Sequence, residues 1–106
     1  MKTMLLTLVV AAGLTMAGAA NAQEDLAKSS GCATCHAVDT KKMGPSYKDI
    51  AAKYKGKPDA RERVFHHVTS GDKVKFEDGH EEPHPIVKTT DPDRINNLVN
   101  WILSLR

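Results

Sequence analysis

The chain has 106 residues, of which 41% are hydrophobic, and its formal net charge at pH 7 is +2. So small a net charge gives no electrostatic reason to expect a nucleic acid as partner. A single domain of this size buries a modest core, and such domains usually depend on a disulfide, a metal or a cofactor for stability.

Residues 1–22 have the pattern of a secretory signal peptide. An early lysine is followed by the apolar run from Met4 to Ala20, and Ala20-Asn21-Ala22 supplies a small-x-small cleavage site. The run is too short, and its Gly/Ala-rich end too weakly hydrophobic, for a permanent membrane span. We therefore expect cleavage after Ala22, one domain over residues 23–106, and a periplasmic protein that does not span the membrane.

The mature chain is predicted to be all-α, with three to five short helices and little or no sheet. A first helix is expected over residues 25–36. A second helix is predicted to begin at Ser46, because Ser46 and Asp49 form a capping-box arrangement ahead of apolar residues on one side.

A third helix is predicted from the same start signal at Asp59 and Glu62. It is expected to run to about Thr69, with Gly71 near its end. The helical pattern then disappears over residues 71–90, which we interpret as a loop long enough to have a function of its own.

The last helix has the clearest signals at its start and along its apolar side. Asp91 is suited to the N-cap, and Pro92 to the first helical position. Apolar residues then recur at intervals of three and four, which predicts a single stripe for packing; they are Ile95, Leu98, Val99, Ile102 and Leu105.

The motif C-x-x-C-H occupies residues 32–36, where Cys32, Cys35 and His36 supply the three functional side chains. In this motif two thiols form thioethers with the vinyl groups of haem, and the next residue binds the iron. The spacing suits this chemistry, since two thioethers three residues apart hold one edge of the ring and bring the imidazole beneath the iron. We expect one covalently attached haem c.

Three other interpretations of the two cysteines remain open. A thioredoxin-type redox pair needs a preceding strand and a βαβ context, which the local sequence does not offer. A structural disulfide in an oxidising compartment leaves His36 without a role. A zinc site formed by Cys32, Cys35, His80 and His84 has acceptable local spacings, although the intervening stretch is far longer than in compact zinc fingers.

The chain resembles the small bacterial monohaem class I cytochromes c in three segments, which are residues 26–39 around the motif, residues 43–54 and residues 100–105. The resemblance covers nearly the whole mature chain. It implies a fold in which the first and last helices cross and the haem lies in a crevice enclosed by the helices. It also implies an electron carrier.

The resemblance further implies roles for two residues outside the motif. The carbonyl of Pro45, in the pair Gly44-Pro45, is expected to accept the Nδ1 proton of His36 and so to orient that imidazole. Trp101 is expected to pack near the haem or near the crossing of the helices. An ordinary place in the core fits Trp101 equally well.

The usual sixth ligand of the family, a methionine in the loop before the last helix, is missing from this chain. Met43 is the only methionine after the predicted cleavage site, and by resemblance it packs on the proximal side of the ring. At the place of the family methionine the sequence is Pro83-His84-Pro85, whose prolines keep the backbone extended. We therefore predict His84 as the distal ligand and bis-histidine iron.

Other ligand sets remain open at this point. His80, in the same loop, and His66 and His67, on the predicted third helix, are competing histidines, for which a surface or core position is the preferred interpretation. A five-coordinate iron is a further alternative. Because a second imidazole stabilises ferric iron more than a thioether does, bis-histidine ligation predicts a lower reduction potential than His/Met ligation.

Basic and acidic residues are separated along the chain. The segment from Lys41 to Arg63 has eight basic residues against three acids, and the segment from Asp72 to Asp93 has seven acids against three lysines. We expect the cysteine edge of the haem, ringed by the basic residues from Lys41 to Lys57, to dock on an acidic patch of a redox partner. The alternative is that the separation of charges has no role in docking. The protein is expected to be a monomer.

Single-electron transfer between redox partners, without catalysis, is the predicted function. A six-coordinate haem has no vacant position for a substrate, and the sequence offers no nucleophile with its base and no phosphate loop. A haem-based sensor or small-ligand binder, in which His84 dissociates to admit NO or CO, is the alternative from another class. A peroxidase is a third and weaker alternative, because a distal histidine bound to iron cannot also act as an acid–base catalyst and no distal arginine can be located from the sequence.

Overall fold

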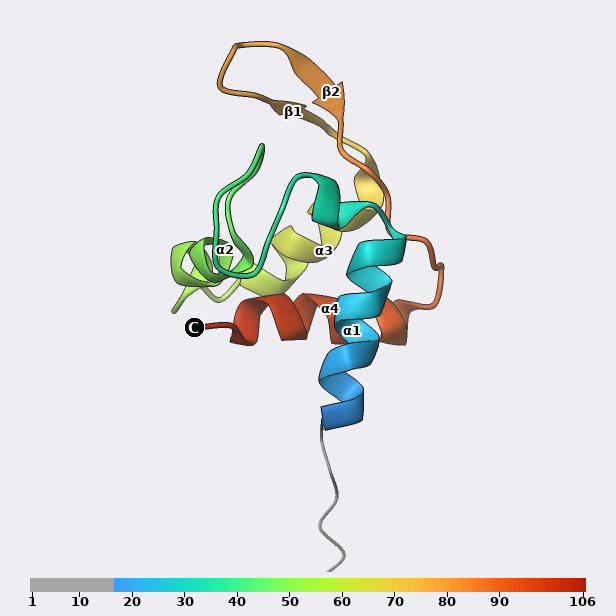
Figure 1. The fold of residues 1–106 in the computed structure, drawn as a ribbon. Coiled ribbons are helices and arrows are strands. Elements are labelled where there is room, and N and C mark those ends of the chain that lie inside the picture. The colour runs from blue at the N-terminus through green and yellow to red at the C-terminus, as the bar shows by residue number, and fades with distance from the viewer. Residues whose placement is uncertain (1–16) are drawn as a thin grey trace, which may run out of the picture.

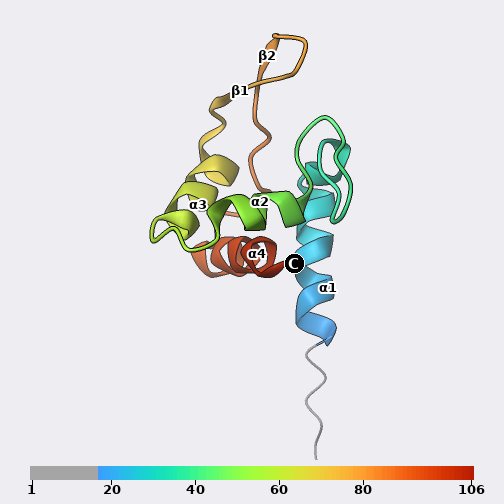
Figure 2. The same ribbon diagram turned by 90° about the vertical axis from the view of Figure 1, so that its left-hand side faces the viewer.

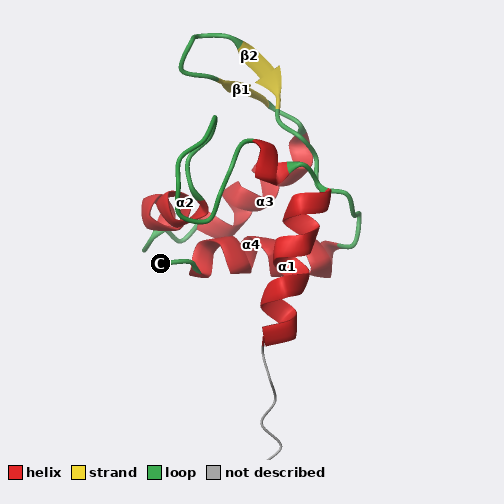
Figure 3. Cartoon of the chain, viewed as in Figure 1, coloured by secondary structure: helices red, strands yellow, loops and turns green. Residues whose placement is uncertain are grey.

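The computed structural model describes residues 17–106, with side chains from residue 21 onward, and most of the predicted signal peptide lies outside the described residues. Figure 1 and Figure 3 show helices with one small sheet. In chain order the elements are α1 (Ala17–Ser29), a 3-10 turn (Cys32–Thr34), α2 (Tyr47–Tyr54), α3 (Ala60–Ser70), β1 (Lys73–Lys75), β2 (Glu81–Pro83) and α4 (Pro92–Ser104).

The core of the domain is organised around α4. Figure 1 shows α1 crossing α4, and α2 and α3 also pack on α4. Leu98 and Val99 of α4 have no exposed surface, and the predicted stripe also places Ile95 and Ile102 in the core. The predicted all-α fold with crossing first and last helices is therefore confirmed. No helix of the described residues is long and apolar enough to cross a membrane.

Two of the predicted helix starts have the expected caps. The Ser46 hydroxyl accepts a hydrogen bond from the backbone N–H of Asp49 at 3.1 Å, and a carboxylate oxygen of Asp91 accepts one from the N–H of Asp93 at 3.0 Å. Each cap provides an acceptor for an N–H that has no partner within its helix. The third start differs, because the carboxylate of Asp59 accepts from Arg63 Nε at 2.6 Å and does not cap α3.

The first helix is shorter than predicted at its C-terminal end. It ends at Ser29, whereas the sequence pattern predicted a helix over residues 25–36. The reason is Gly31, whose φ of +84° belongs to the left-handed region that ends α-helices. The cysteine motif consequently starts on a separate turn. At its other end α1 begins at Ala17 and spans the predicted cleavage site.

The segment predicted as a loop contains an antiparallel hairpin. Strand β1 pairs with β2 in the register Val74↔Glu82, with Lys75 opposite Glu81. Opposite charges across a strand pair stabilise such a hairpin modestly. Each strand has only three residues, so no alternating pattern could show in the sequence. Figure 1 and Figure 2 show the hairpin projecting from the helical body, directly ahead of the segment that contains His84.

Candidate functional site

The cysteine motif forms a compact turn between α1 and the loop that follows it. The backbone N–H groups of Cys35 and His36 both donate to the Cys32 carbonyl, at 3.1 and 2.9 Å. Both cysteines are half-buried, and they are not joined in a disulfide. Burial raises the pKa of the Cys32 thiol above its ordinary value. The turn therefore brings two sulfurs and an adjacent imidazole together within five residues.

His36 is oriented by the Gly44-Pro45 segment. Its Nδ1 donates to the Pro45 carbonyl at 2.6 Å, and because a carbonyl oxygen can only accept, Nε2 is the nitrogen left with a free lone pair. A Cβ added at Gly44 would lie 2.6 Å from His36 Cε1 and 3.0 Å from Nδ1. Glycine is therefore needed here because the backbone passes directly against the imidazole.

His84 has the same arrangement on the other side of the site. Its Nδ1 donates to the Pro85 carbonyl at 2.8 Å, which again leaves Nε2 with the free lone pair. Desolvation by burial lowers the pKa of the imidazole below its ordinary value, so the neutral ring is favoured at pH 7. A neutral imidazole is the form that binds a metal.

The two imidazoles lie at a spacing that fits one metal ion between them. The ring centroids of His36 and His84 are 6.3 Å apart, and the ring planes are inclined by 47°. An imidazole nitrogen binds a transition metal at about 2 Å, and the ring centroid lies about 1 Å behind the nitrogen, so opposed ligands have centroids about 6 Å apart. The residues present therefore fit an iron ion held between two histidines.

Backbone contacts hold the segment that contains His84 at three points. The N–H of His84 donates to the Asp72 carbonyl at 3.0 Å, and the N–H of Val87 donates to the Val68 carbonyl at 2.9 Å. The N–H of Lys88 donates to the Ser30 hydroxyl at 3.0 Å. The buried Ser30 precedes the cysteine motif, so this last bond joins the two sides of the site.

Ser30→Ala is expected to lower the free energy of unfolding by about 1–3 kcal/mol, because the partly buried Lys88 N–H then loses its acceptor. Urea unfolding of the haem-containing protein measures this loss. Ser29→Ala is the matched control, since the Ser29 hydroxyl is exposed and donates only within its own helix, to Leu26 at 3.1 Å. Equal losses in the two variants would contradict a specific role for Ser30.

The competing histidines occupy different places. The His80 ring stacks on Phe76 in the hairpin, with centroids 4.3 Å apart, and His66 hydrogen-bonds a carboxylate oxygen of Asp72 at 2.7 Å. His67 lies at the site, because its ring centroid is 4.0 Å from that of His84. Desolvation, followed by the charges of His84 and His36, lowers the pKa of His67 to about 4.

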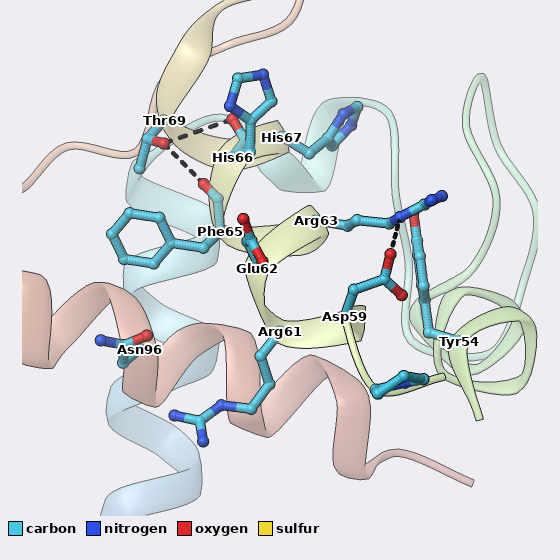
Figure 4. Close-up of a pocket in the computed structure, with 11 residues that line it drawn as sticks. Tyr54, Asp59, Arg61, Glu62, Arg63, Phe65, His66, His67, Thr69 and Asn96 are labelled. Atoms are coloured by element: carbon cyan, nitrogen blue, oxygen red, sulfur yellow. Dashed lines mark hydrogen bonds and ion pairs between the residues drawn. The ribbon is translucent and has the colours of Figure 1, made fainter. Parts of the chain in front are cut away.

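An open groove of about 1030 Å³ follows α3 and the end of α2. Figure 4 shows its lining, in which the rings of His66 and His67 leave α3 in different directions and Arg63 pairs with Asp59. Of the histidines considered as ligands, only these two line the groove. Within the described part of the chain, no three His, Cys, Asp or Glu side chains are grouped to share one metal ion.

Tyr47 is a residue of the site that the sequence analysis did not single out. It is buried, its ring stacks on that of His36 with centroids 5.7 Å apart, and the half-buried Trp101 contacts it edge-on at 5.5 Å. Burial raises the pKa of Tyr47 to about 12. Tyr47 therefore lies between Trp101 and His36 and contacts both rings. Met43, by contrast, is 54% exposed.

The predicted basic ring is partly neutralised. Lys41 forms an ion pair with Glu77 at the tip of the hairpin, and Lys48 forms one with Asp39. Lys42 Nζ donates to the Ala33 carbonyl at 2.6 Å. Exposed ion pairs of this kind contribute little to stability, but they reduce the positive charge available for docking. The pairing with Glu77 was not predictable without the hairpin.

Comparisons with known proteins identify similar chains. A family model for cytochrome c matches residues 18–106. The chain is 41% identical to cytochrome c-552 of Nitrosomonas europaea over 106 residues, which is the whole of both chains. The crystal structure of the class 1 cytochrome MtoD from Sideroxydans lithotrophicus ES-1 is 53% identical with a TM-score of 0.76, covering 80% of this chain and 94% of that one. The crystal structure of N. europaea cytochrome c552 is 38% identical with a TM-score of 0.63, covering 78% and 99%.

Proposed function

The chain belongs to the cytochrome c family, and on this basis we propose that it is a periplasmic carrier of single electrons whose haem iron is bound by two histidines. Membership establishes one covalently attached haem c, and the relatives are small electron-transfer cytochromes. The location, the ligands and the residues that hold the haem are parts of the proposal.

Cys32 and Cys35 are assigned the two thioether bonds, and His36 the proximal position on the iron. The position of both half-buried cysteines on one turn beside His36, and the orientation of His36 by Pro45, support this assignment. The carbonyl bond fixes the imidazole with Nε2 available and raises its basicity. Haem supplies the redox chemistry, and the protein supplies ligands, orientation and burial.

The observation that carries the bis-histidine proposal is the pair His36 and His84. Their rings are separated by the distance that one metal ion requires, and each donates Nδ1–H to a proline carbonyl, which directs Nε2 to the metal. The three backbone hydrogen bonds of the segment after the hairpin hold His84 at this position. A stable sixth ligand favours electron transfer over the binding of small molecules.

Optical spectra and a redox titration of the purified protein test this proposal. We expect low-spin, six-coordinate iron in both oxidation states, without the red-region band of thioether-bound ferric iron. In His84→Met the reduction potential should rise on the order of 0.1 V, a fraction of the roughly 0.8 V range that axial ligands produce. A parent protein that already has the thioether band and the higher potential would refute the two-histidine assignment.

We propose that a redox partner docks at the cysteine edge of the haem, beside the lysines from Lys48 to Lys57. Lys53 and Lys57 are exposed, and their Nζ atoms lie over the Tyr54 ring at 5.4 and 5.7 Å from its centroid. Oxidation of the ferrous protein by hexacyanoferrate(III), an anionic probe, should slow on the order of tenfold from low to high ionic strength. A cationic cobalt complex is the control. Equal responses to salt with both probes would remove the lysines from the proposal.

Export by cleavage after Ala22 is also part of the proposal. An early lysine, an apolar run and a small-x-small site support it. Because α1 begins at Ala17, cleavage would leave residues 23–29 as the first helix of the mature protein. The mass of the protein isolated from the periplasm reports both the cleavage site and the covalent haem.

A further inference from the structure

A second imidazole contacts the proposed distal ligand. The ring centroids of His67 and His84 are 4.0 Å apart, and the ring planes are inclined by 47°. The His84 ring has the spacing from His36 that one metal ion requires. On the basis of the proposed bis-histidine iron, we propose that His67 is a positioning residue that fixes the plane of the His84 imidazole.

The packing of α3 brings His67 to this position. Val64 and Val68, four residues apart and both buried, set the rotation of α3 about its axis. Neighbouring helical residues point about 100° apart, so only one of the two adjacent histidines can reach the site. Figure 4 shows the two rings diverging, and His66 is bonded to Asp72.

The same part of α3 also holds the segment that contains His84. The carbonyl of Val68, the residue after His67, accepts the N–H of Val87 at 2.9 Å. The carbonyl of Asp72, just beyond the end of α3, accepts the N–H of His84 at 3.0 Å. Backbone bonds at and after His84 therefore hold the backbone of this segment against the end of α3, beside His67.

Two restraints then act on the His84 ring. The hydrogen bond from Nδ1 to the Pro85 carbonyl, 2.8 Å long, fixes which edge of the ring faces away from the metal. This bond alone does not stop the ring from rotating about the Cβ–Cγ bond. Its acceptor, the Pro85 carbonyl, belongs to the next residue and can move together with the ring. A second ring in van der Waals contact blocks that rotation, because the tilt cannot change without a clash.

The angle between two axial imidazole planes has a direct spectroscopic readout. In ferric low-spin iron this angle sets the splitting of the d orbitals, and the g values of the electron paramagnetic resonance spectrum report the splitting. Loss of a residue that orients a metal ligand typically lowers metal affinity or activity by about 10- to 100-fold, so we expect it to weaken the bond of that ligand as well. CO binding to ferrous iron reports how readily His84 leaves.

The experiment compares the haem-containing parent protein with His67→Ala, His67→Phe and the control His66→Ala. His67→Ala should remain low-spin, with a shifted largest g value and CO binding faster by about tenfold. His67→Phe should return both values toward the parent, because it restores a ring in contact with His84. His66→Ala should match the parent, since His66 lies on the same helix but is directed elsewhere.

Three results would overturn the inference. Parent-like g values and CO rates in His67→Ala would show that the ring contact does not orient the ligand. Equal shifts in His66→Ala would reveal a general effect of altering α3. A high-spin His67→Ala protein would make His67 a ligand itself. A parent without two-histidine spectra would instead refute the proposed function, so the two failures are distinguishable.

Discussion

His84→Ala is expected to convert the iron from low-spin to high-spin in both oxidation states, because the proposed sixth ligand is lost and the alanine has no donor atom. Optical and electron paramagnetic resonance spectra of the purified variant measure the change. Added imidazole should restore the low-spin spectrum by occupying the vacated position. CO should then bind the ferrous variant without the delay that dissociation of a protein ligand imposes.

Two further variants separate this prediction from its alternatives. His80→Ala changes the other histidine of the same segment, whose ring stacks on Phe76, and should leave the spectra unchanged. The double variant His67→Ala/His84→Ala tests whether the adjacent imidazole replaces the lost ligand. A double variant that stays low-spin would show that neither residue is the distal ligand, and the assignment of His84 would then be wrong.

Gly44→Ala is expected to disrupt the proximal side of the site. The new Cβ would lie 2.6 Å from His36 Cε1, closer than a Cβ atom approaches a non-bonded atom, and a tight 3.2 Å from the Cys35 carbonyl oxygen. The imidazole must move, and it then loses the geometry of its 2.6 Å bond to Pro45. Overpacking of this kind typically costs about 1–3 kcal/mol. We expect less haem-containing protein, a lower Tm and a perturbed spectrum.

Gly56→Ala is a suitable control for the change at Gly44. Gly56 has a φ of +77°, so alanine is strained there, but no atom lies within 4 Å of the added Cβ. That variant should lose stability, by about 1 kcal/mol, and keep the parent spectrum. If Gly44→Ala has the same spectrum and Tm as the parent protein, the close approach to His36 is not required.

Local signals in the sequence predicted the parts of the fold that depend on neighbouring residues. Ser46 and Asp91 cap their helices with hydrogen bonds that span two or three positions, so the sequence itself shows them. The apolar stripe of α4 is equally visible, and its central residues Leu98 and Val99 are fully buried. The caps and the stripe can both be predicted from the sequence, because they depend only on short, regular spacings within one helix.

Other features depend on contacts between segments distant in the sequence. The hairpin went unpredicted because three-residue strands show no pattern, and with it the ion pair of Lys41 and Glu77, which are 36 positions apart. The end of α1 was misplaced because Gly31 was not recognised as a left-handed terminator. Tyr47 was missed because only its contacts with His36 and Trp101 distinguish it from any other buried aromatic residue.

The attachment motif, the prolines on either side of His84 and the helix caps could all be identified from residue order, because short spacings along one chain define each of them. Three contacts became visible with the folded chain: the 6.3 Å separation of the His36 and His84 rings, the contact of His67 with His84, and the bond by which Ser30 joins the two sides. These contacts arise from the packing of α3 and the hairpin segment, and packing depends on the relative placement of whole elements, which local patterns do not encode.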